Sequence, residues 1–186
     1  MKNLNLKFFR PAIVLSLVVA AAALLLSVLQ QAVHVDENEI SGVLLEKCTA
    51  LMGEGEFELI EAETELPKGV RKVIKHAESG TVAFQVVVKG YNKDGLNLLI
   101  VIENGSVKSL AIVENKETPG IGTKVTTDDY LGNFIGQTGD VKIVKGGARR
   151  DNEVAAVTGA TKSARGVADA VNAAIEAYAL LFGEGK

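Results

Sequence analysis

The chain has 186 residues, of which 47% are hydrophobic, and carries 20 Lys and Arg against 23 Asp and Glu. This length suits one domain with a sizeable core plus an appendage. Cys48 is the only cysteine, which excludes an intramolecular disulfide, a Cys-x-x-Cys redox pair, and a zinc cage or iron–sulfur cluster held by this chain alone. His34 and His76 are far apart in sequence, which argues against a histidine-based catalytic triad. We therefore predict no catalytic residue and no metal site.

An uncharged stretch at residues 11–33 follows a short basic segment, residues 1–10. A bilayer core needs about 20 apolar residues in a helix, and this stretch is of that size. The alternative is a cleaved signal peptide, whose apolar part is typically about 7–15 residues and ends at a small-residue cleavage site. This chain has Gln30-Gln31, which are not small residues, at the position expected for that cleavage site. We predict an uncleaved transmembrane anchor at 11–33, with a domain at residues 34–186 after it.

Charges on the two sides of this stretch predict its orientation. Three basic residues precede it and three acidic residues follow it closely: Lys2, Lys7 and Arg10, then Asp36, Glu37 and Glu39. The basic end of such a span stays in the cytoplasm. We therefore expect a single-pass protein of the inner (plasma) membrane with an extracytoplasmic domain. That domain has 17 basic against 23 acidic residues, a formal charge of −6, which argues against a nucleic-acid partner.

The first part of the domain shows a helical pattern and then four strand patterns. Apolar residues at helical spacing predict a helix over 37–51, with Cys48 on its core side. Runs rich in β-branched residues predict strands at 70–75, 82–88, 96–102 and 107–113. Asp94-Gly95 and Asn104-Gly105 are hairpin turn sequences, so these strands should pair antiparallel.

The second part of the domain has fewer regular elements. We expect a glycine-rich loop at 114–125, a short helix at 130–135, a strand at 141–144 and a charged loop at 145–152. The basic residues Lys142, Lys145 and Arg149-Arg150 are either solvated charges or a docking patch. One apolar face then recurs at steps of three and four: Val167, Val171, Ala174, Ile175, Tyr178 and Phe182. This predicts an amphipathic C-terminal helix. The fold class is α+β, with a mostly antiparallel sheet flanked by helices.

Two hydroxyls, a glycine and a small side chain are concentrated in Thr158-Gly159-Ala160-Thr161-Lys162-Ser163, just before that helix. One interpretation is a turn followed by an N-cap, in which Thr161 or Ser163 accepts a backbone N–H. The other is a helix start that holds a phosphate. A P-loop is not supported, because that motif needs glycine directly before the lysine and Thr161 stands there.

A second motif is Glu117-Thr118-Pro119-Gly120-Ile121-Gly122-Thr123-Lys124. Its proline fixes one backbone angle, and its glycines permit a sharp turn or the close approach of a flat ligand. Thr118, free N–H groups and Lys124 could bond a heterocycle that carries carbonyls; the alternative is an ordinary surface turn. The third glycine of a dinucleotide-binding fingerprint is absent.

Together the two motifs, about forty residues apart behind an N-terminal anchor, closely resemble a known family. The chain is similar over essentially its whole length, Gly90-Tyr91 and Gly105 included, to the FMN-binding subunits of bacterial respiratory complexes. These are the G subunit of the Rnf complex and the C subunit of the sodium-pumping NADH:quinone reductase. In that family the last threonine of a Ser/Thr-Gly-Ala-Thr motif forms a phosphoester with FMN, added by a flavin transferase that uses FAD. The resemblance therefore implies covalent FMN on Thr161.

The same resemblance implies a set of cofactor-binding residues: Thr158, Gly159, Ala160, Ser163, Glu117, Thr118, Pro119, Gly120, Ile121, Gly122, Lys124, Gly90 and Tyr91. Attachment through phosphate at a helix start places its charge beside backbone donors and leaves the flavin ring chemically free. The family usually has an aspartate three residues before the first Ser/Thr, where this chain has Ala155; Glu153 or Asp151 could replace it in the encounter with the transferase. Lys162 and Arg165 could screen the phosphate or be solvated.

The resemblance implies an electron carrier within a complex that couples ferredoxin:NAD electron transfer to movement of sodium or protons. Its partners would be neighbouring membrane subunits, among them a second covalent-flavin subunit, and iron–sulfur subunits. The short N-terminal segment, the total length and the run from Thr158 to Arg165 favour the Rnf branch over the quinone-reductase branch. Two further alternatives are a stand-alone extracytoplasmic FMN-dependent reductase or sensor, and a structural anchored domain without a cofactor.

Overall fold

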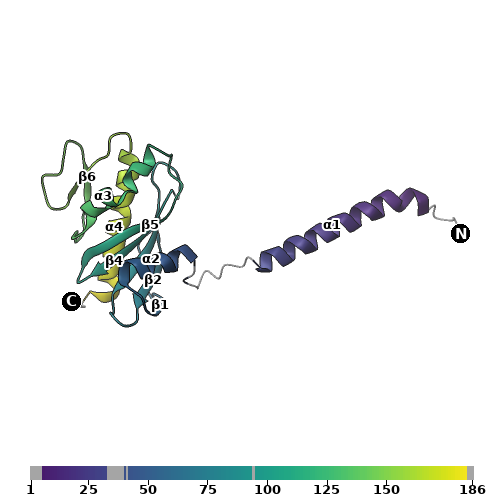
Figure 1. Cartoon of the computed structure of the whole chain (residues 1–186), viewed down its shortest axis with the longest axis horizontal. Coiled ribbons are helices and arrows are strands. Elements are labelled where there is room, and N and C mark those ends of the chain that lie inside the picture. Colours follow the sequence, from purple (N-terminus) through teal and green to yellow (C-terminus); the bar gives the residue numbers. More distant parts are fainter. Residues whose placement is uncertain (1–5, 33–39, 41, 94, 184–186) are drawn as a thin grey trace. The chain divides into compact units, whose positions relative to one another are not determined.

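A computed structural model describes residues 6–32, 40, 42–93 and 95–183 (Figure 1). The chain divides into two compact units, Met1–Glu39 and Ile40–Lys186. Several features considered above lie outside the described residues: positions 1–5, His34 and the acidic residues after the apolar stretch, the first residues of the helix predicted to start at 37, and Asp94 of the predicted Asp94-Gly95 turn.

The described residues of the first unit form the helix α1 (Leu6–Ala32). Its segment Arg10–Leu29 spans 20 residues with a mean hydropathy of 2.9, so by length and composition it is able to cross a membrane. Pro11 lies in the second turn of this helix, where its missing N–H removes one backbone hydrogen bond. The large apolar side chains of this segment are exposed all round, as those of a helix that meets lipid are.

The second unit is built on a five-stranded antiparallel sheet whose strands pair in sequence order. These strands are β1 (Phe57–Leu59), β2 (Val70–His76), β3 (Val82–Val88), β4 (Leu96–Glu103) and β5 (Ser106–Asn115). The four predicted strands are confirmed, and β1, which is too short to show a period, was missed. Asn104 and Gly105 both have positive φ, 52° and 76°, and form the predicted two-residue turn between β4 and β5.

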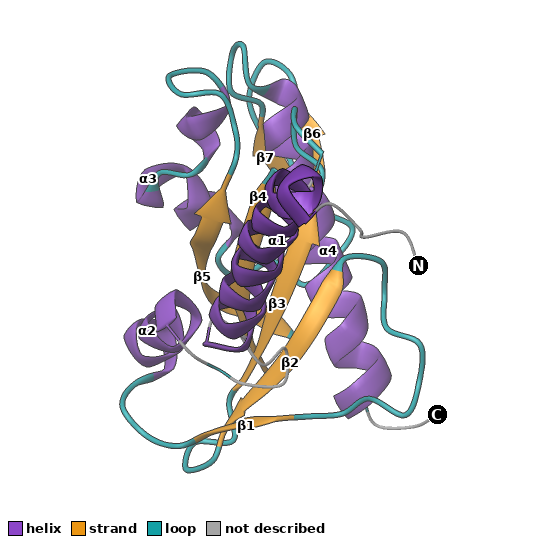
Figure 2. Cartoon of the chain, turned by 90° about the vertical axis from the view of Figure 1, so that its right-hand side faces the viewer, coloured by secondary structure: helices purple, strands orange, loops and turns teal. Residues whose placement is uncertain are grey.

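Two helices cover opposite faces of the sheet (Figure 2). The C-terminal helix α4 (Thr161–Phe182) packs on a row of paired residues that includes Val73, Phe84 and Ile100. The shorter helix α2 (Gly42–Met52) covers the alternate positions, such as Ile74 and Leu99. Most of the predicted apolar face of the last helix is confirmed, since Val167, Val171, Ala174, Ile175 and Tyr178 pack in the core, whereas Phe182 is 37% exposed. The fold is α+β, as expected.

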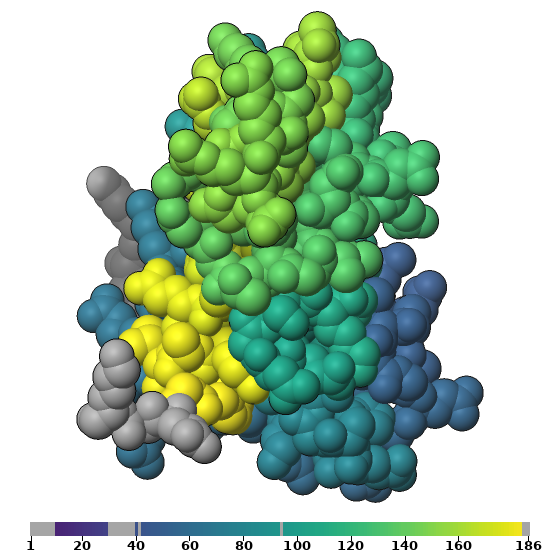
Figure 3. Space-filling view, turned by 90° about the vertical axis from the view of Figure 1, so that its left-hand side faces the viewer, coloured from purple at the N-terminus to yellow at the C-terminus, as the bar shows by residue number. Residues whose placement is uncertain are grey.

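The remaining elements are short and lie between β5 and α4. They are the 3₁₀ helix η1 (Gly122–Val125), α3 (Asp128–Leu131), η2 (Gly132–Phe134), β6 (Lys142–Val144) and β7 (Glu153–Ala155). The predicted short helix starts earlier than expected, because Thr127 caps it by accepting a hydrogen bond from the Tyr130 N–H. Strand β7 was missed; it pairs in parallel with β6. Figure 3 shows the segment that carries them, in light green, at one end of this face, with the C-terminal part of α4 (yellow) toward the other.

The layer between α2 and the sheet encloses Cys48, which has no exposed surface. Burial raises the pKa of its thiol to about 11. We expect iodoacetamide at pH 8 to label the native protein at least ~100-fold more slowly than the unfolded chain, because only the thiolate reacts. The unfolded thiol ionises first, so this contribution to stability is present below about pH 9 and is lost as the pH rises toward 11.

The measurement is the alkylation time course by intact mass, with and without guanidinium chloride. A Cys48→Ser variant serves as the unlabelled control. Fast labelling of the native protein would show that α2 leaves the sheet readily.

Candidate functional site

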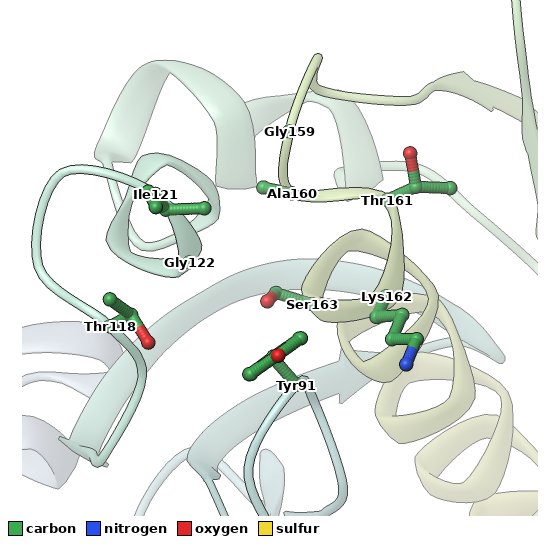
Figure 4. Close-up of a pocket in the computed structure, with 9 residues that line it drawn as sticks. All are labelled: Tyr91, Thr118, Ile121, Gly122, Gly159, Ala160, Thr161, Lys162 and Ser163. Atoms are coloured by element: carbon green, nitrogen blue, oxygen red, sulfur yellow. The ribbon is translucent and has the colours of Figure 1, made fainter.

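Three segments meet at one end of the sheet. They are the β3–β4 connection at residues 89–95, the segment at 116–122 after β5, and the first turn of α4. Because these strands are antiparallel, β3 ends, β4 starts and β5 ends at the same end of the sheet. The segments enclose a cavity of about 460 Å³, a size typical of small-molecule sites, lined by Tyr91, Thr118, Ile121, Gly122, Gly159, Ala160, Thr161, Lys162 and Ser163 (Figure 4).

The carboxylate of Glu117 connects all three segments. Its side chain is buried, with 4% of the residue exposed. It accepts hydrogen bonds from the backbone N–H groups of Tyr91 and Asn92, both at 3.1 Å, and from the hydroxyl of Ser163. Such charge-assisted bonds offset the cost of burying the carboxylate. Glu117 therefore lies behind the cavity wall and holds its parts together.

Glycines make room for this carboxylate. A Cβ added at Gly90 or Gly122 would lie 2.6 Å from an oxygen of Glu117, and one added at Gly95 would lie closer still. A real side chain could not approach so near. Gly122 was predicted to permit the approach of a flat ligand, and Gly90 was included in the cofactor-binding set that the resemblance implies. In the structure they also permit the approach of Glu117, and Gly122 lines the cavity as well.

The β3–β4 connection occupies the interval between Val88 and Leu96, as the predicted strand bounds require, and Asp94 of the predicted turn lies outside the described residues. The connection presents two backbone N–H groups to Glu117 and places Tyr91 at the cavity. Asn92 fixes the connection further, since its side-chain amide donates to the Lys116 carbonyl at 2.6 Å.

The start of α4 differs from the predicted N-cap. The helix begins at Thr161 with Ala160 in the N-cap position and no side-chain cap. The expectation that Thr161 or Ser163 caps the helix is wrong, because the Ser163 hydroxyl donates to Glu117 instead. The first N–H groups of a helix have no intrahelical partner, and without a cap they suit an anion.

The three hydroxyl residues of this motif have different environments. Ser163 is 1% exposed and bonded to Glu117. Thr158 is exposed and does not line the main cavity. Thr161 is half-buried in the cavity wall. Only Thr161 combines access with a position at the cavity.

The other predicted cofactor residues divide into two groups. Tyr91, Thr118, Ile121, Gly122, Gly159, Ala160 and Ser163 line the cavity with Thr161. Glu117 lies behind the wall, Thr158 lines an adjoining cavity, and Gly90, Pro119, Gly120 and Lys124 line neither. Gly120 has a φ of +73°, and a Cβ added there would meet no atom within 4 Å, so it serves the turn.

One residue outside the predicted set also lines the cavity. The Lys162 ammonium lies 5.3 Å from the centre of the Tyr91 ring, a cation–π contact. Its position next to Thr161 is the one signal for it in the sequence. Among the described residues that line the cavity Lys162 is the only charged one.

The cavity residues fit FMN. An aromatic ring, an isoleucine and small residues provide flat walls for a flavin ring, and hydroxyls and a cation provide polar contacts. Tyr91 is 63% exposed and Ile121 is 52% exposed, so the cavity opens to the surface beside them. These residues could hold a flavin with one edge accessible.

Gly166 brings α4 against the site. A Cβ at this position would lie 2.7 Å from the Lys89 carbonyl oxygen and 3.2 Å from the Gly90 Cα. We expect Gly166→Ala to lower the free energy of unfolding by about 1–3 kcal/mol through overpacking, although alanine favours helices by about 1 kcal/mol.

Gly132→Ala is the matched control, because its φ is −54° and a Cβ there meets nothing within 4 Å. We expect it to be neutral or stabilising by up to about 1 kcal/mol. Urea unfolding of both variants gives the comparison. Stabilisation of both variants would show that α4 does not approach the loop this closely.

Comparison with known proteins identifies the class of this domain. Residues 90–176 match the family described as the FMN-binding domain. This stretch contains both sequence motifs and all the residues that line the cavity. The second unit therefore contains an FMN-binding domain.

Curated relatives are G subunits of ion-translocating complexes. The chain is 32% identical over 98 residues to the G subunit of the proton-translocating ferredoxin:NAD(+) oxidoreductase complex of Clostridium ljungdahlii, a match that covers 52% of this chain and about half, 53%, of that protein. It is 26% identical over 178 residues to the G subunit of the Na(+)-translocating ferredoxin:NAD(+) oxidoreductase complex of Acetobacterium woodii, covering 86% of this chain and 85% of that one.

A solved structure agrees with this assignment. NqrC of Shewanella oneidensis superimposes with a TM-score of 0.50 at 25% identity, over 64% of this chain and 65% of that one. The C subunit of the Na(+)-translocating NADH-quinone reductase of Parabacteroides distasonis has the same fold, with a TM-score of 0.53 at 17% identity, over 77% and 83% of the two chains. The matched FMN-binding domain and these relatives make the chain similar to the G subunits of ion-translocating oxidoreductase complexes.

Proposed function

We propose that the chain is a membrane-anchored electron-transfer subunit that carries covalent FMN in an ion-translocating ferredoxin:NAD oxidoreductase complex. The observation that carries this proposal is the cavity of about 460 Å³ with Thr161 in its wall, inside the matched FMN-binding domain. The relatives of the chain are named as subunits of such complexes. The flavin supplies the redox chemistry, and the protein positions it and sets its surroundings.

Thr161 is the proposed attachment point, through a phosphoester. Within the Thr158–Ser163 motif it is the residue that both lines the cavity and is only half-buried, and the uncapped first turn of α4 favours a negative charge beside it. A covalent bond prevents loss of the flavin on the outer side of the membrane. The proposed orientation, with residues 1–10 in the cytoplasm, the anchor at 11–33 and the domain at 34–186 outside, rests on the basic flank and on the apolar helix α1.

The proposal includes maturation by a flavin transferase. Ala155, where the family has an aspartate, is exposed at the end of β7, so a carboxylate is not needed there for packing. Glu153 accepts a hydrogen bond from the Arg149 N–H at 2.9 Å and is mostly covered. Asp151 is exposed. Asp151 is therefore the better placed of the two carboxylates to meet the transferase.

The test is co-expression of the full chain with a flavin transferase, followed by acid denaturation. We expect flavin fluorescence to remain with the polypeptide and the intact mass to increase by one FMN less one water. A peptide map locates the modified residue, and the same mass shows whether the N-terminal segment is retained. A chain that acquires no flavin under these conditions would support the structural anchored domain instead.

The partners are tested by purification from the native membrane. We expect other membrane subunits, among them a second covalent-flavin subunit, and iron–sulfur subunits to copurify with the chain and with ferredoxin:NAD activity. Copurification with quinone-reductase activity would place the chain in the other branch, which its structural neighbours represent. A monomer that turns over a soluble donor and acceptor would support a stand-alone reductase.

A further inference from the structure

A second cavity adjoins the first. It has a volume of about 300 Å³ and is lined by Lys145, Gly146, Ala156, Val157, Thr158, Gly159 and Thr161. Gly159 and Thr161 line both cavities. The proposed attachment residue therefore stands between two hollows of different size.

The parallel pairing of β6 and β7 brings Lys145 to this cavity. The two strands run in the same direction with Val144 opposite Ala155, and the Ala156 N–H donates to the Val144 carbonyl at 2.8 Å. The residues that follow the two strands, Lys145 and Ala156, consequently lie side by side. Gly146 then turns the chain away, with a φ of +86°. A lysine that lies 16 positions from Thr161 in sequence thus lines the same hollow.

The side chains of Thr161 and Lys162 point in different directions. In Figure 4 the Thr161 hydroxyl points away from the space between Thr118, Ile121 and Tyr91, whereas the Lys162 ammonium points toward the Tyr91 side. Thr161 itself contacts the second cavity. The Thr161 oxygen is therefore directed away from the first cavity, and the second cavity, which Thr161 also lines, contains Lys145.

The charges of the second cavity suit a phosphate. Lys145 is exposed and is the only charged residue among those that line it. Two neighbouring basic side chains have acidic partners: Lys142 pairs with Asp140, and Arg150 pairs with Glu153. Within the described part of the chain, the ion pairs do not include Lys145. A phosphodiester carries one negative charge, which a single ammonium group balances.

We propose that the second cavity is the phosphate subsite of the flavin site, with Lys145 as the counter-ion of the phosphate, while the first cavity takes the ring. This inference rests on the proposed FMN function and assigns a role to a residue of the predicted solvated loop. Lys145 acts on the phosphate and has no part in holding the ring.

The test compares FMN with riboflavin, which has the same ring and no phosphate. The full chain, purified in detergent without a transferase, is titrated with each flavin and fluorescence is recorded. We expect Lys145→Gln to weaken FMN binding roughly threefold to tenfold and to leave riboflavin binding unchanged. Lys145→Arg should retain most of the FMN affinity. Lys142→Gln is the matched control and should change neither, because Lys142 pairs with Asp140 outside the cavity.

A second readout uses the protein after covalent loading. The phosphorus NMR resonance of the phosphodiester should move in Lys145→Gln and stay in place in Lys142→Gln. The phosphate assignment would be overturned if Lys145→Gln weakened FMN and riboflavin binding equally. It would also be overturned if the variant changed the affinity for neither flavin and left the phosphorus resonance in place. Wild-type protein that binds no flavin and acquires none would refute the proposed function itself, a separate outcome.

Discussion

Thr161→Ala is expected to abolish covalent flavin while leaving the domain folded. The variant lacks the hydroxyl to which the flavin phosphate is proposed to bond, so no phosphoester forms when it is expressed with a flavin transferase. The fold should tolerate the change, because Thr161 is half-buried at a helix start that has no side-chain cap to lose. Stability should change by no more than about 1 kcal/mol. Intact mass and flavin fluorescence after acid denaturation measure the loss.

Two further variants give this experiment its controls. Thr161→Ser keeps a hydroxyl and should accept FMN, though to a lower extent if the transferase contacts the methyl group. Thr158→Ala should still acquire covalent flavin, because Thr161 keeps its hydroxyl, although Thr158 lines the second cavity. If Thr161→Ala still carries covalent flavin, another hydroxyl is the attachment point and the phosphoester assignment is wrong.

Glu117→Ala should have the largest effect on stability. It leaves the N–H groups of Tyr91 and Asn92 and the Ser163 hydroxyl without their acceptor inside the protein. Each unsatisfied buried donor costs about 1–3 kcal/mol, and water that enters the vacated space offsets part of the sum, so we expect a loss of about 3–5 kcal/mol. Flavin incorporation should fall as well, because the three segments around the cavity lose their common partner.

Chemical denaturation with flavin loading as a second measurement tests this expectation. Glu117→Gln should be intermediate, since its amide offers one accepting oxygen instead of two. Glu114→Gln is the matched control: Glu114 is exposed, 3.5 Å from Lys116, and its loss should change stability by no more than about 0.5 kcal/mol. A Glu117→Ala protein as stable as the control would mean that water replaces the carboxylate without cost.

The sequence predicted those parts of the fold that depend on neighbouring residues. Runs such as 82–88 and 96–102 carry their own β signal, and Asn104-Gly105 specifies a turn by its positive φ values. Strand β7 and its parallel pairing with β6 escaped detection, because a three-residue strand has no period and its partner is not adjacent in sequence.

The residues of the site could likewise be predicted where they are neighbours in sequence. Thr161 and most of the cavity residues belong to two short sequence motifs, so the sequence identified them. The role of Glu117 was not visible, because its three donors come from residues 91, 92 and 163. The same is true of Lys145, which the parallel strands bring to the second cavity and which the sequence placed in a charged loop.

The bond between Ser163 and Glu117, 46 residues apart, constrains the order of events during biogenesis. The sheet can form progressively, because each strand pairs with the one before it. The flavin cavity cannot, since one of its walls belongs to the first turn of α4, which follows all the described strands in the chain. If the domain is exported N-terminus first, as we propose, no flavin site exists until the strands and the start of α4 have crossed the membrane. Attachment of the cofactor must then be a late step that reports completed folding.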